Sequence, residues 1–285
     1  MYTPSPKEGA TVAPTPSHAV ETNDSGTPQR AAWDLTLAEW GVGLTTVGLN
    51  VLVNGVLPQR WHVPASLAAA GVVSAFAGAA GARTREQGTS VDRVPAGAGY
   101  GVAASLPAAA AVLAAMLSSR TREAFREPRI EDVSAPQAAY EVLARIPFGT
   151  ALPEELIFRG AVLGLLTQRH SPALAISLSS VLFGLWHIAP TLDRLESNAA
   201  TNGKPVAHKA ARVAMAVAAT SAAGVALAWL QRRSGSIVAP WMAHCAVNGT
   251  GYLCAWTAAR IARRVAASEA PLPEWTRAGA SDANA

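Results

Sequence analysis

The sequence predicts an all-α, polytopic membrane protein, because its composition is apolar and its apolar residues are grouped. Half of the 285 residues are hydrophobic and only 15% are charged, whereas a typical soluble domain is about 25% charged. The apolar residues form blocks close to the roughly 20 residues that a helix needs to cross a bilayer. We therefore predict about seven transmembrane helices that enclose a cavity within the membrane.

The predicted spans are rich in Ala, Val, Leu and Gly and are separated by polar or charged residues. In order, they are Leu35–Leu57, Val63–Ala82, Ala98–Leu117, Thr150–Leu166, Pro172–Ile188, Ala210–Leu230 and Ser236–Ala259. Residues 1–32 are rich in Pro, Thr and Ser and lack the apolar core of a signal peptide, which predicts a disordered tail. We expect a membrane-embedded domain at residues 33–264 and a second polar tail at 265–285.

The net charge of +4 comes from arginines that lie mostly between or beside the apolar blocks. This pattern is typical of loops that face anionic lipid and argues against nucleic acid as a partner. A count of Lys and Arg by alternate loops favours the side that holds Arg120–Arg129 and Arg260–Arg264, which predicts a cytoplasmic C-terminus. We expect a multi-pass protein of the cell membrane. Its Arg-rich, Ala-rich composition is typical of bacteria and favours the inner membrane; its oligomeric state is left open.

The segment ALPEELIFRG, residues 151–160, places three charged side chains in an apolar block. Pro153 suits the first turn of a helix, so Glu154 and Glu155 are expected near the N-terminal end of that helix. Glu155 and Arg159 are four residues apart and can pair on one face, while Glu154 is left to face another direction. The plainer interpretation is a helix entry with acidic residues and one structural ion pair.

Two further motifs repeat the spacing of four residues in later apolar blocks. Phe183 and His187 share a helical face in SSVLFGLWHIAP, and the helix is expected to end before Pro190. His244 and Asn248 share a face in PWMAHCAVNGTGY. Taken alone, His187 fits an interfacial histidine, and the His244–Asn248 pair fits a hydrogen bond between helices.

Together, the three motifs predict a polar site inside the bundle, since polar groups in membrane helices seek one another. A carboxylate or imidazole can take a proton from water, and an imidazole and a carboxamide can donate hydrogen bonds to an oxyanion. These are the requirements of amide-bond hydrolysis. A proton-coupled transporter is an alternative, but transporters of this kind are built from repeats, and the N-terminal half offers only Glu39 within an apolar block.

The three motifs resemble those of the CAAX prenyl protease and bacteriocin-processing (CPBP, Abi-type) intramembrane proteases. The resemblance covers about residues 141–259 and rests on Glu154-Glu155-x-x-x-Arg159, Phe183-x-x-x-His187 and His244-x-x-x-Asn248. It implies an intramembrane endopeptidase whose substrate is a membrane-associated protein or peptide. A non-catalytic membrane scaffold or a bacteriocin self-immunity factor is the alternative within this resemblance.

The resemblance also implies a role for each residue. Glu154 and His187 would activate the attacking water, and His244 and Asn248 would form the oxyanion hole. Glu155, Arg159 and Phe183 would support the site. A His₂Glu zinc set of Glu154, His187 and His244 is the metal alternative; the helical pattern H-E-x-x-H is absent, and activation without a cofactor is favoured because it accounts for Asn248.

Overall fold

The computed structural model describes residues 27–52, 56–119, 121, 125, 127–197 and 205–269. Every regular element in this part of the chain is helical, as the sequence predicts. The predicted tails lie largely outside the described residues. Helix α1 already begins at Thr27, and α10 continues to Glu269.

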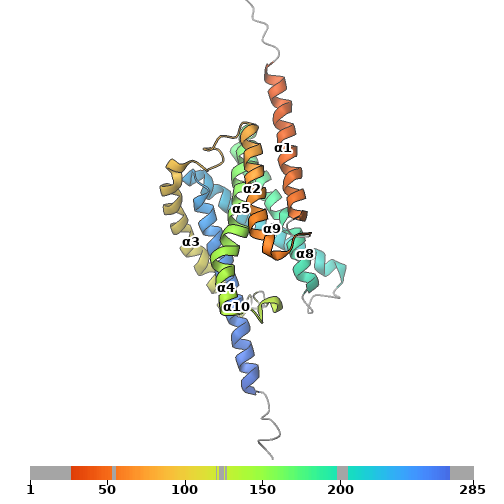
Figure 1. Cartoon of the computed structure of the whole chain (residues 1–285), viewed down its shortest axis with the longest axis vertical. Helices are drawn as coiled ribbons and strands as arrows, with labels where there is room; N and C mark the ends of the chain where they lie inside the picture. Colours follow the sequence, from red (N-terminus) through yellow and green to blue (C-terminus); the bar gives the residue numbers. More distant parts are fainter. Residues whose placement is uncertain are drawn as a thin grey trace, which may run out of the picture.

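The helices form one elongated bundle (Figure 1). Helix α1 extends beyond the bundle at one end, and the last turns of α10 extend beyond it at the other. The longer helices are α1 (Thr27–Val51), α2 (His62–Ala79), α3 (Val94–Leu117), α7 (Pro172–Trp186), α8 (Ile188–Ser197), α9 (Val206–Ser234) and α10 (Val238–Glu269). A further helical run consists of α4 (Ala135–Tyr140), the π-helix η6 (Glu141–Ala151), α5 (Leu152–Glu155), the π-helix η7 (Leu156–Val162) and α6 (Leu163–Leu166).

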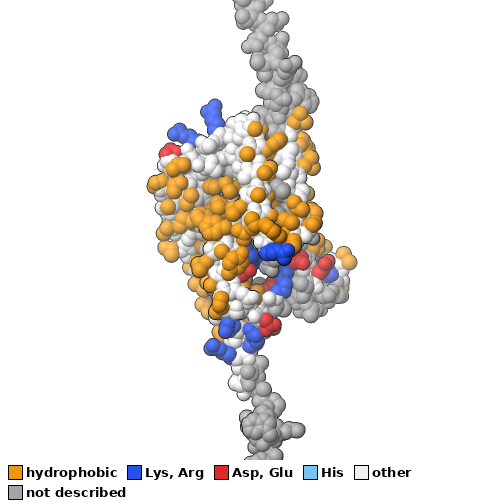
Figure 2. All heavy atoms as spheres, viewed as in Figure 1, with side chains coloured by type: hydrophobic (Ala, Val, Ile, Leu, Met, Phe, Trp, Pro, Cys, Tyr) orange, Lys and Arg blue, Asp and Glu red, His pale blue; other side chains and the backbone are white. Residues whose placement is uncertain are grey.

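Four helical segments of the described chain are long and apolar enough to cross a membrane: His62–Ala79, Val91–Leu117, Pro172–Glu196 and Val206–Ser234. They correspond to four of the seven predicted spans; the other three overlap α1, the run from α4 to α6 and α10, and part of the first of these lies outside the described residues. Large apolar side chains such as Leu106, Met215 and Trp229 are exposed, as expected of surfaces that face lipid. In Figure 2 a belt of hydrophobic side chains separates charged groups near the two ends. The protein is a multi-pass membrane protein.

The continuous helical run from Ala135 to Leu166 passes through the centre of the bundle, where its last part, from Ala151 onward, is buried. Ile157, Phe158, Ala161, Leu163 and Leu165 are each at most 2% exposed. Helices α2, α7 and α10 pack against this run. Polar groups on this buried part of the run therefore have protein as their surroundings.

A loop, and not a neighbouring helix, packs on the small residues Gly160 and Gly164. A small-xxx-small pair predicts the close approach of another helix, but here a Cβ at either glycine would lie 3.4–3.5 Å from Glu86 or Gln87. Gln87 is buried and donates from Nε2 to the carbonyl of Ala82 over 2.9 Å. The two glycines thus make room for the α2–α3 connection inside the protein.

Candidate active site

The two glutamates lie in the middle of the central helical run and not at a helix N-terminus. The expectation that Pro153 begins a helix was wrong, because helical backbone is continuous from Ala135 to Leu166. Proline lacks the N–H for an i→i−4 bond, and the turns around both Pro147 and Pro153 include π-helix, whose bonds reach one residue further. The Pro147 carbonyl accepts from Leu152 N–H and also from the indole of Trp241 over 2.9 Å.

Glu155 is completely buried and contacts two polar groups through one oxygen. Its Oε1 accepts from Nη1 of Arg159 over 3.1 Å and from Nδ1 of His244 over 2.8 Å. Arg159 is itself 1% exposed. The pair that the i, i+4 spacing predicts is therefore present, and it also orients an imidazole from α10.

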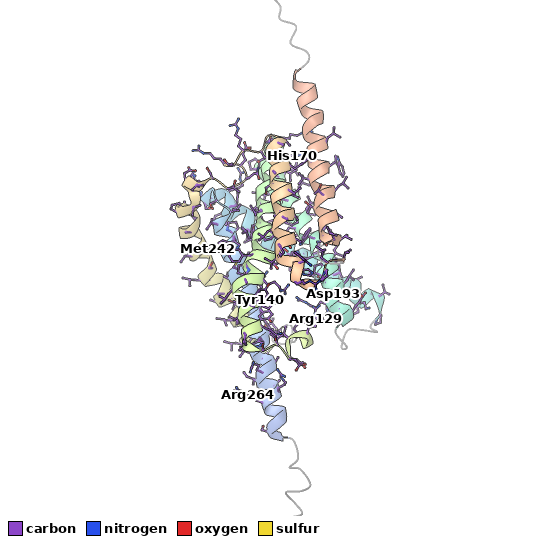
Figure 3. All side chains as sticks on the ribbon, viewed as in Figure 1. Arg129, Tyr140, His170, Asp193, Met242 and Arg264 are labelled. Atoms are coloured by element: carbon purple, nitrogen blue, oxygen red, sulfur yellow. The ribbon has the colours of Figure 1, made fainter. Side chains whose placement is uncertain are left out.

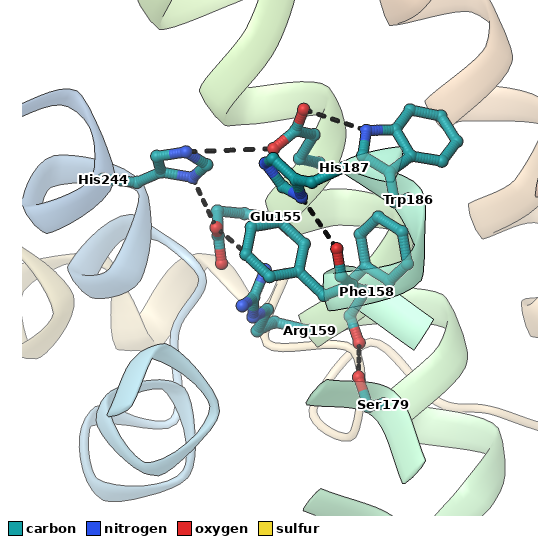
Figure 4. A network of polar contacts seen from close by, with 9 residues as sticks. Glu155, Phe158, Arg159, Ser179, Trp186, His187 and His244 are labelled. Atoms are coloured by element: carbon teal, nitrogen blue, oxygen red, sulfur yellow. Dashed lines mark hydrogen bonds and ion pairs between the residues drawn. The ribbon is translucent and has the colours of Figure 1, made fainter. Parts of the chain in front are cut away.

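Glu154 is held from a different side, by Trp186, which directly precedes His187. Its Oε1 accepts from the indole N–H of Trp186 over 3.1 Å. Its Oε2 lies 3.8 Å from Nε2 of His244 and has no hydrogen-bond partner in the described part of the chain. Figure 4 shows this arrangement, with His187 between His244 and Trp186. The two glutamates thus approach the two ring nitrogens of His244.

The ring of Phe183 lies next to the side chains of Arg159, His187 and His244. The guanidinium carbon of Arg159 lies 4.0 Å above its centroid, a cation–π distance. The ring centroids of His187 and His244 lie 4.7 Å and 6.0 Å away. Phe183 is 2% exposed, so it packs the two imidazoles and the guanidinium around one buried surface.

His187 terminates α7, and its side chain is oriented by that helix end. Its Nδ1 lies 2.8 Å from the carbonyl of Phe183. A carbonyl only accepts, so this contact assigns the hydrogen to Nδ1 in the neutral ring and leaves Nε2 as the basic nitrogen. The His187 carbonyl in turn accepts from the hydroxyl of Thr191 in α8 over 2.6 Å.

Asn248 is less tightly held than the other predicted site residues. It lies one helical turn beyond His244 on α10 and is half-buried. Within the described residues its side chain makes no hydrogen bond. The structure therefore joins Glu154, Glu155, Arg159, Phe183, His187 and His244 in one network of contacts and leaves Asn248 one turn outside it.

Three buried polar atoms of the network lack a hydrogen-bond partner among the described residues: Glu154 Oε2, Glu155 Oε2 and Arg159 Nη2. Buried polar atoms are normally satisfied, so such exceptions require an explanation. The charged groups of the network are two carboxylates and one guanidinium, and the imidazole of His244 lies between the carboxylates. A water or a reacting group would satisfy the free oxygen of Glu154.

The histidine and carboxylate side chains of the site could also supply ligands to a metal. Within the described residues, no group of three or more His, Cys, Asp or Glu side chains is arranged to hold a metal ion. The Nδ1 atoms of His187 and His244 are turned toward Phe183 and Glu155, respectively. Only Nε2 of each ring would remain for a metal together with Glu154.

Two contacts of the site were not expected from the motifs: Trp186 with Glu154, and His244 with Glu155. Both join residues of different helices, and neither follows from spacing along one helix. The available signal was Trp186 itself, an indole donor in an apolar block directly before His187. Buried tryptophan usually finds an acceptor for its N–H.

The fold and this site define a multi-pass helical membrane protein with a buried cluster of carboxylate, guanidinium and imidazole groups. Residues 136–250 match the family model described as type II CAAX prenyl endopeptidase Rce1-like. The match spans less than half of the chain and includes all three motifs, which confirms the CPBP resemblance. No curated protein and no solved structure matches the chain.

Proposed function

We propose that the protein is an intramembrane endopeptidase that hydrolyses a peptide bond of a membrane-associated protein or peptide. The observation that carries this proposal is the free Oε2 of Glu154, which is buried, unpartnered and directed toward Nε2 of His244 at 3.8 Å. A carboxylate kept in this way has an open position for a water proton. The family match supports the same class of reaction.

In the proposed reaction, Glu154 Oε2 takes a proton from a water while the water oxygen attacks the carbonyl carbon of the substrate. The proton then passes to the departing amine nitrogen as the C–N bond breaks, so that Glu154 is regenerated. His187 assists through Nε2, the nitrogen that its contact with Phe183 leaves basic. This use of a carboxylate and an imidazole follows general acid–base catalysis.

His244 and Asn248 are proposed to stabilise the oxyanion of the tetrahedral intermediate. The carboxylate of Glu155 only accepts hydrogen bonds, so Nδ1 of His244 donates to it. Donation to the oxyanion must therefore come from Nε2–H, and His244 would act with hydrogen on both nitrogens. The amide of Asn248, which has no partner in the described chain, would supply the second donor.

The substrate is proposed to reach the site from the membrane, because the site lies in a bundle with apolar outer surfaces. The family model bears the name of prenyl endopeptidases, and a prenylated C-terminal peptide is one substrate to test beside unmodified membrane peptides. We further propose that the protein lies in the cell membrane with its C-terminus in the cytoplasm, as the arginines near the end of α10 favour (Arg264 in Figure 3).

The decisive experiment incubates the purified protein with a library of membrane peptides, prenylated and unmodified, and identifies products by mass spectrometry. Glu154→Gln is nearly isosteric and should lower turnover by about 10²–10⁴-fold, the usual contribution of a general base. Glu39→Gln is the matched control, since this carboxylate pairs with Arg169 away from the site. Cleavage by Glu154→Gln at the wild-type rate would reject Glu154 as the base, and absence of cleavage by the wild type would reject the proposal and favour a scaffold or self-immunity factor.

A further inference from the structure

We propose that Trp186 is a positioning residue that determines which oxygen of Glu154 acts as the base; this inference rests on the proposed function. The indole N–H contacts Oε1 at 3.1 Å. The other oxygen, Oε2, has no partner in the described chain and lies 3.8 Å from Nε2 of His244. One oxygen is thus anchored, and the other is left open on the side of the second histidine.

A neutral donor is suited to this task. The two oxygens of a free carboxylate are equivalent, and rotation of the side chain would exchange them. A hydrogen bond from an indole fixes the rotation without bringing a positive charge to the carboxylate. Glu155 shows the contrasting case, because its anchored oxygen contacts both Arg159 and His244. The residue held by a charge is the supporting acid, and the residue held by a neutral group is the proposed base.

Trp186 is in turn held in one orientation by its neighbours. Its ring packs edge-on against Phe158, with the centroids 5.5 Å apart. Its backbone carbonyl accepts from Nδ2 of Asn50 over 3.4 Å. Asn50 is a buried polar residue of α1, the helix in which the sequence shows no motif. Helix α1 therefore reaches the site through Asn50 and Trp186.

The test compares Trp186→Phe with Trp256→Phe. Both variants lose an indole N–H and keep an aromatic ring, but Trp256 donates to the backbone carbonyl of Val133. We expect Trp186→Phe to lower kcat by about 10- to 100-fold, as hydrogen bonds to charged groups typically contribute, with KM within about twofold of the wild type. Trp256→Phe should retain wild-type kcat. Equal kcat for Trp186→Phe and the wild type would overturn the inference.

Two additions separate positioning from a structural effect. In the Glu154→Gln background, Trp186→Phe should leave the residual turnover unchanged, because the oxygen that it positions is already replaced. If Trp186→Phe does not fold, benzothienylalanine at position 186 keeps the ring shape and lacks the N–H, and it should show the same loss of kcat. A further loss of turnover in the double variant, or full kcat with benzothienylalanine, would overturn the inference. Wild-type turnover by Glu154→Gln alone would instead reject Glu154 as the base, and no turnover by the wild type would reject the proposed function.

Discussion

Nδ1 of His244 donates to Oε1 of Glu155 over 2.8 Å, across the interface between α10 and the central helical run. The same oxygen accepts from Arg159, so one carboxylate holds a guanidinium of its own helix and an imidazole of another. Loss of this carboxylate would release both groups. Glu155 therefore determines the position of His244 as well as the local charge balance.

The buried pair predicts a large loss of stability when either partner is removed. Glu155→Ala or Arg159→Ala leaves an uncompensated charge in the core and should cost about 3–5 kcal/mol. Glu141→Ala breaks the contact of Glu141 with Arg145, which has the same i, i+4 spacing but is partly exposed, and it should cost about 1 kcal/mol or less. Thermal unfolding in detergent measures all three. Equal melting temperatures for the three variants would contradict the burial argument.

Removal of His244 should slow the reaction without unfolding the protein. His244→Ala is expected to lower kcat by about 10²–10³-fold, the usual effect of losing one oxyanion-hole donor. His208→Ala changes an exposed histidine at the start of α9 and should leave kcat unchanged. Steady-state kinetics of both variants test this prediction, and melting curves check that both variants are folded. Full turnover by His244→Ala would remove it from the proposed oxyanion hole.

Turnover should persist after treatment with a strong chelator if Glu154 and His187 activate water without a metal. Elemental analysis of the active protein should then find no stoichiometric zinc. Activity lost on chelation and restored by added zinc would assign Glu154, His187 and His244 as a His₂Glu ligand set. Activity restored by buffer exchange alone would instead point to inhibition by the chelator.

A surface ion pair between η5 (Pro128–Ile130) and α8 should respond to salt. Arg129 contacts Asp193 over 2.7 Å and Glu127 over 3.1 Å, and Arg129 and Asp193 are labelled in Figure 3. Arg129→Glu should lower stability by about 0.2–1 kcal/mol in dilute salt and less in concentrated salt. Adding Asp193→Arg should recover part of the loss. Melting curves at low and high salt test this, and an effect independent of salt would contradict it.

The stability contributed by the ion pairs of Arg129 should be insensitive to moderately alkaline pH. The hydrogen bond from Arg129 to Glu127 raises the pKa of Arg129 above its ordinary value. A group whose pKa is raised in the folded state stabilises the fold below its pKa in the unfolded state. This stabilisation is lost only as the pH rises through the pKa in the folded state. That loss lies at strongly alkaline pH, so the salt effect of Arg129→Glu should be the same at neutral and mildly basic pH.

The sequence allowed prediction of contacts within one helix but not of those between helices. The pair of Glu155 and Arg159 follows from spacing alone, because residues four apart share a helical face. The contacts of Trp186 with Glu154 and of His244 with Glu155 depend on how three helices pack, which no local pattern specifies. The expected helix start at Pro153 failed because the turns include π-helix, and proline usually signals a boundary.

The α2–α3 connection shows a second limit of local patterns. Gly160 and Gly164 correctly indicate a close neighbour, yet small residues accommodate a buried loop as well as a helix. The loop contains Gly88, whose φ of 67° suits glycine. Its carbonyl accepts from the N–H of Ile237 in the α9–α10 turn over 2.9 Å. Such a contact becomes predictable only once both connections are known to lie at the same end of the bundle.

The continuous helical backbone from Ala135 to Leu166 makes the geometry of the site depend on the number of residues that precede Glu154. Each residue added to or removed from a helix turns everything beyond it by about 100° relative to the other end. A single deletion between Glu141 and Ala151 would leave the apolar character of the segment intact, yet it would rotate Glu154 away from Trp186 or force the chain before it to turn. This segment should therefore accept substitutions far more readily than changes in length.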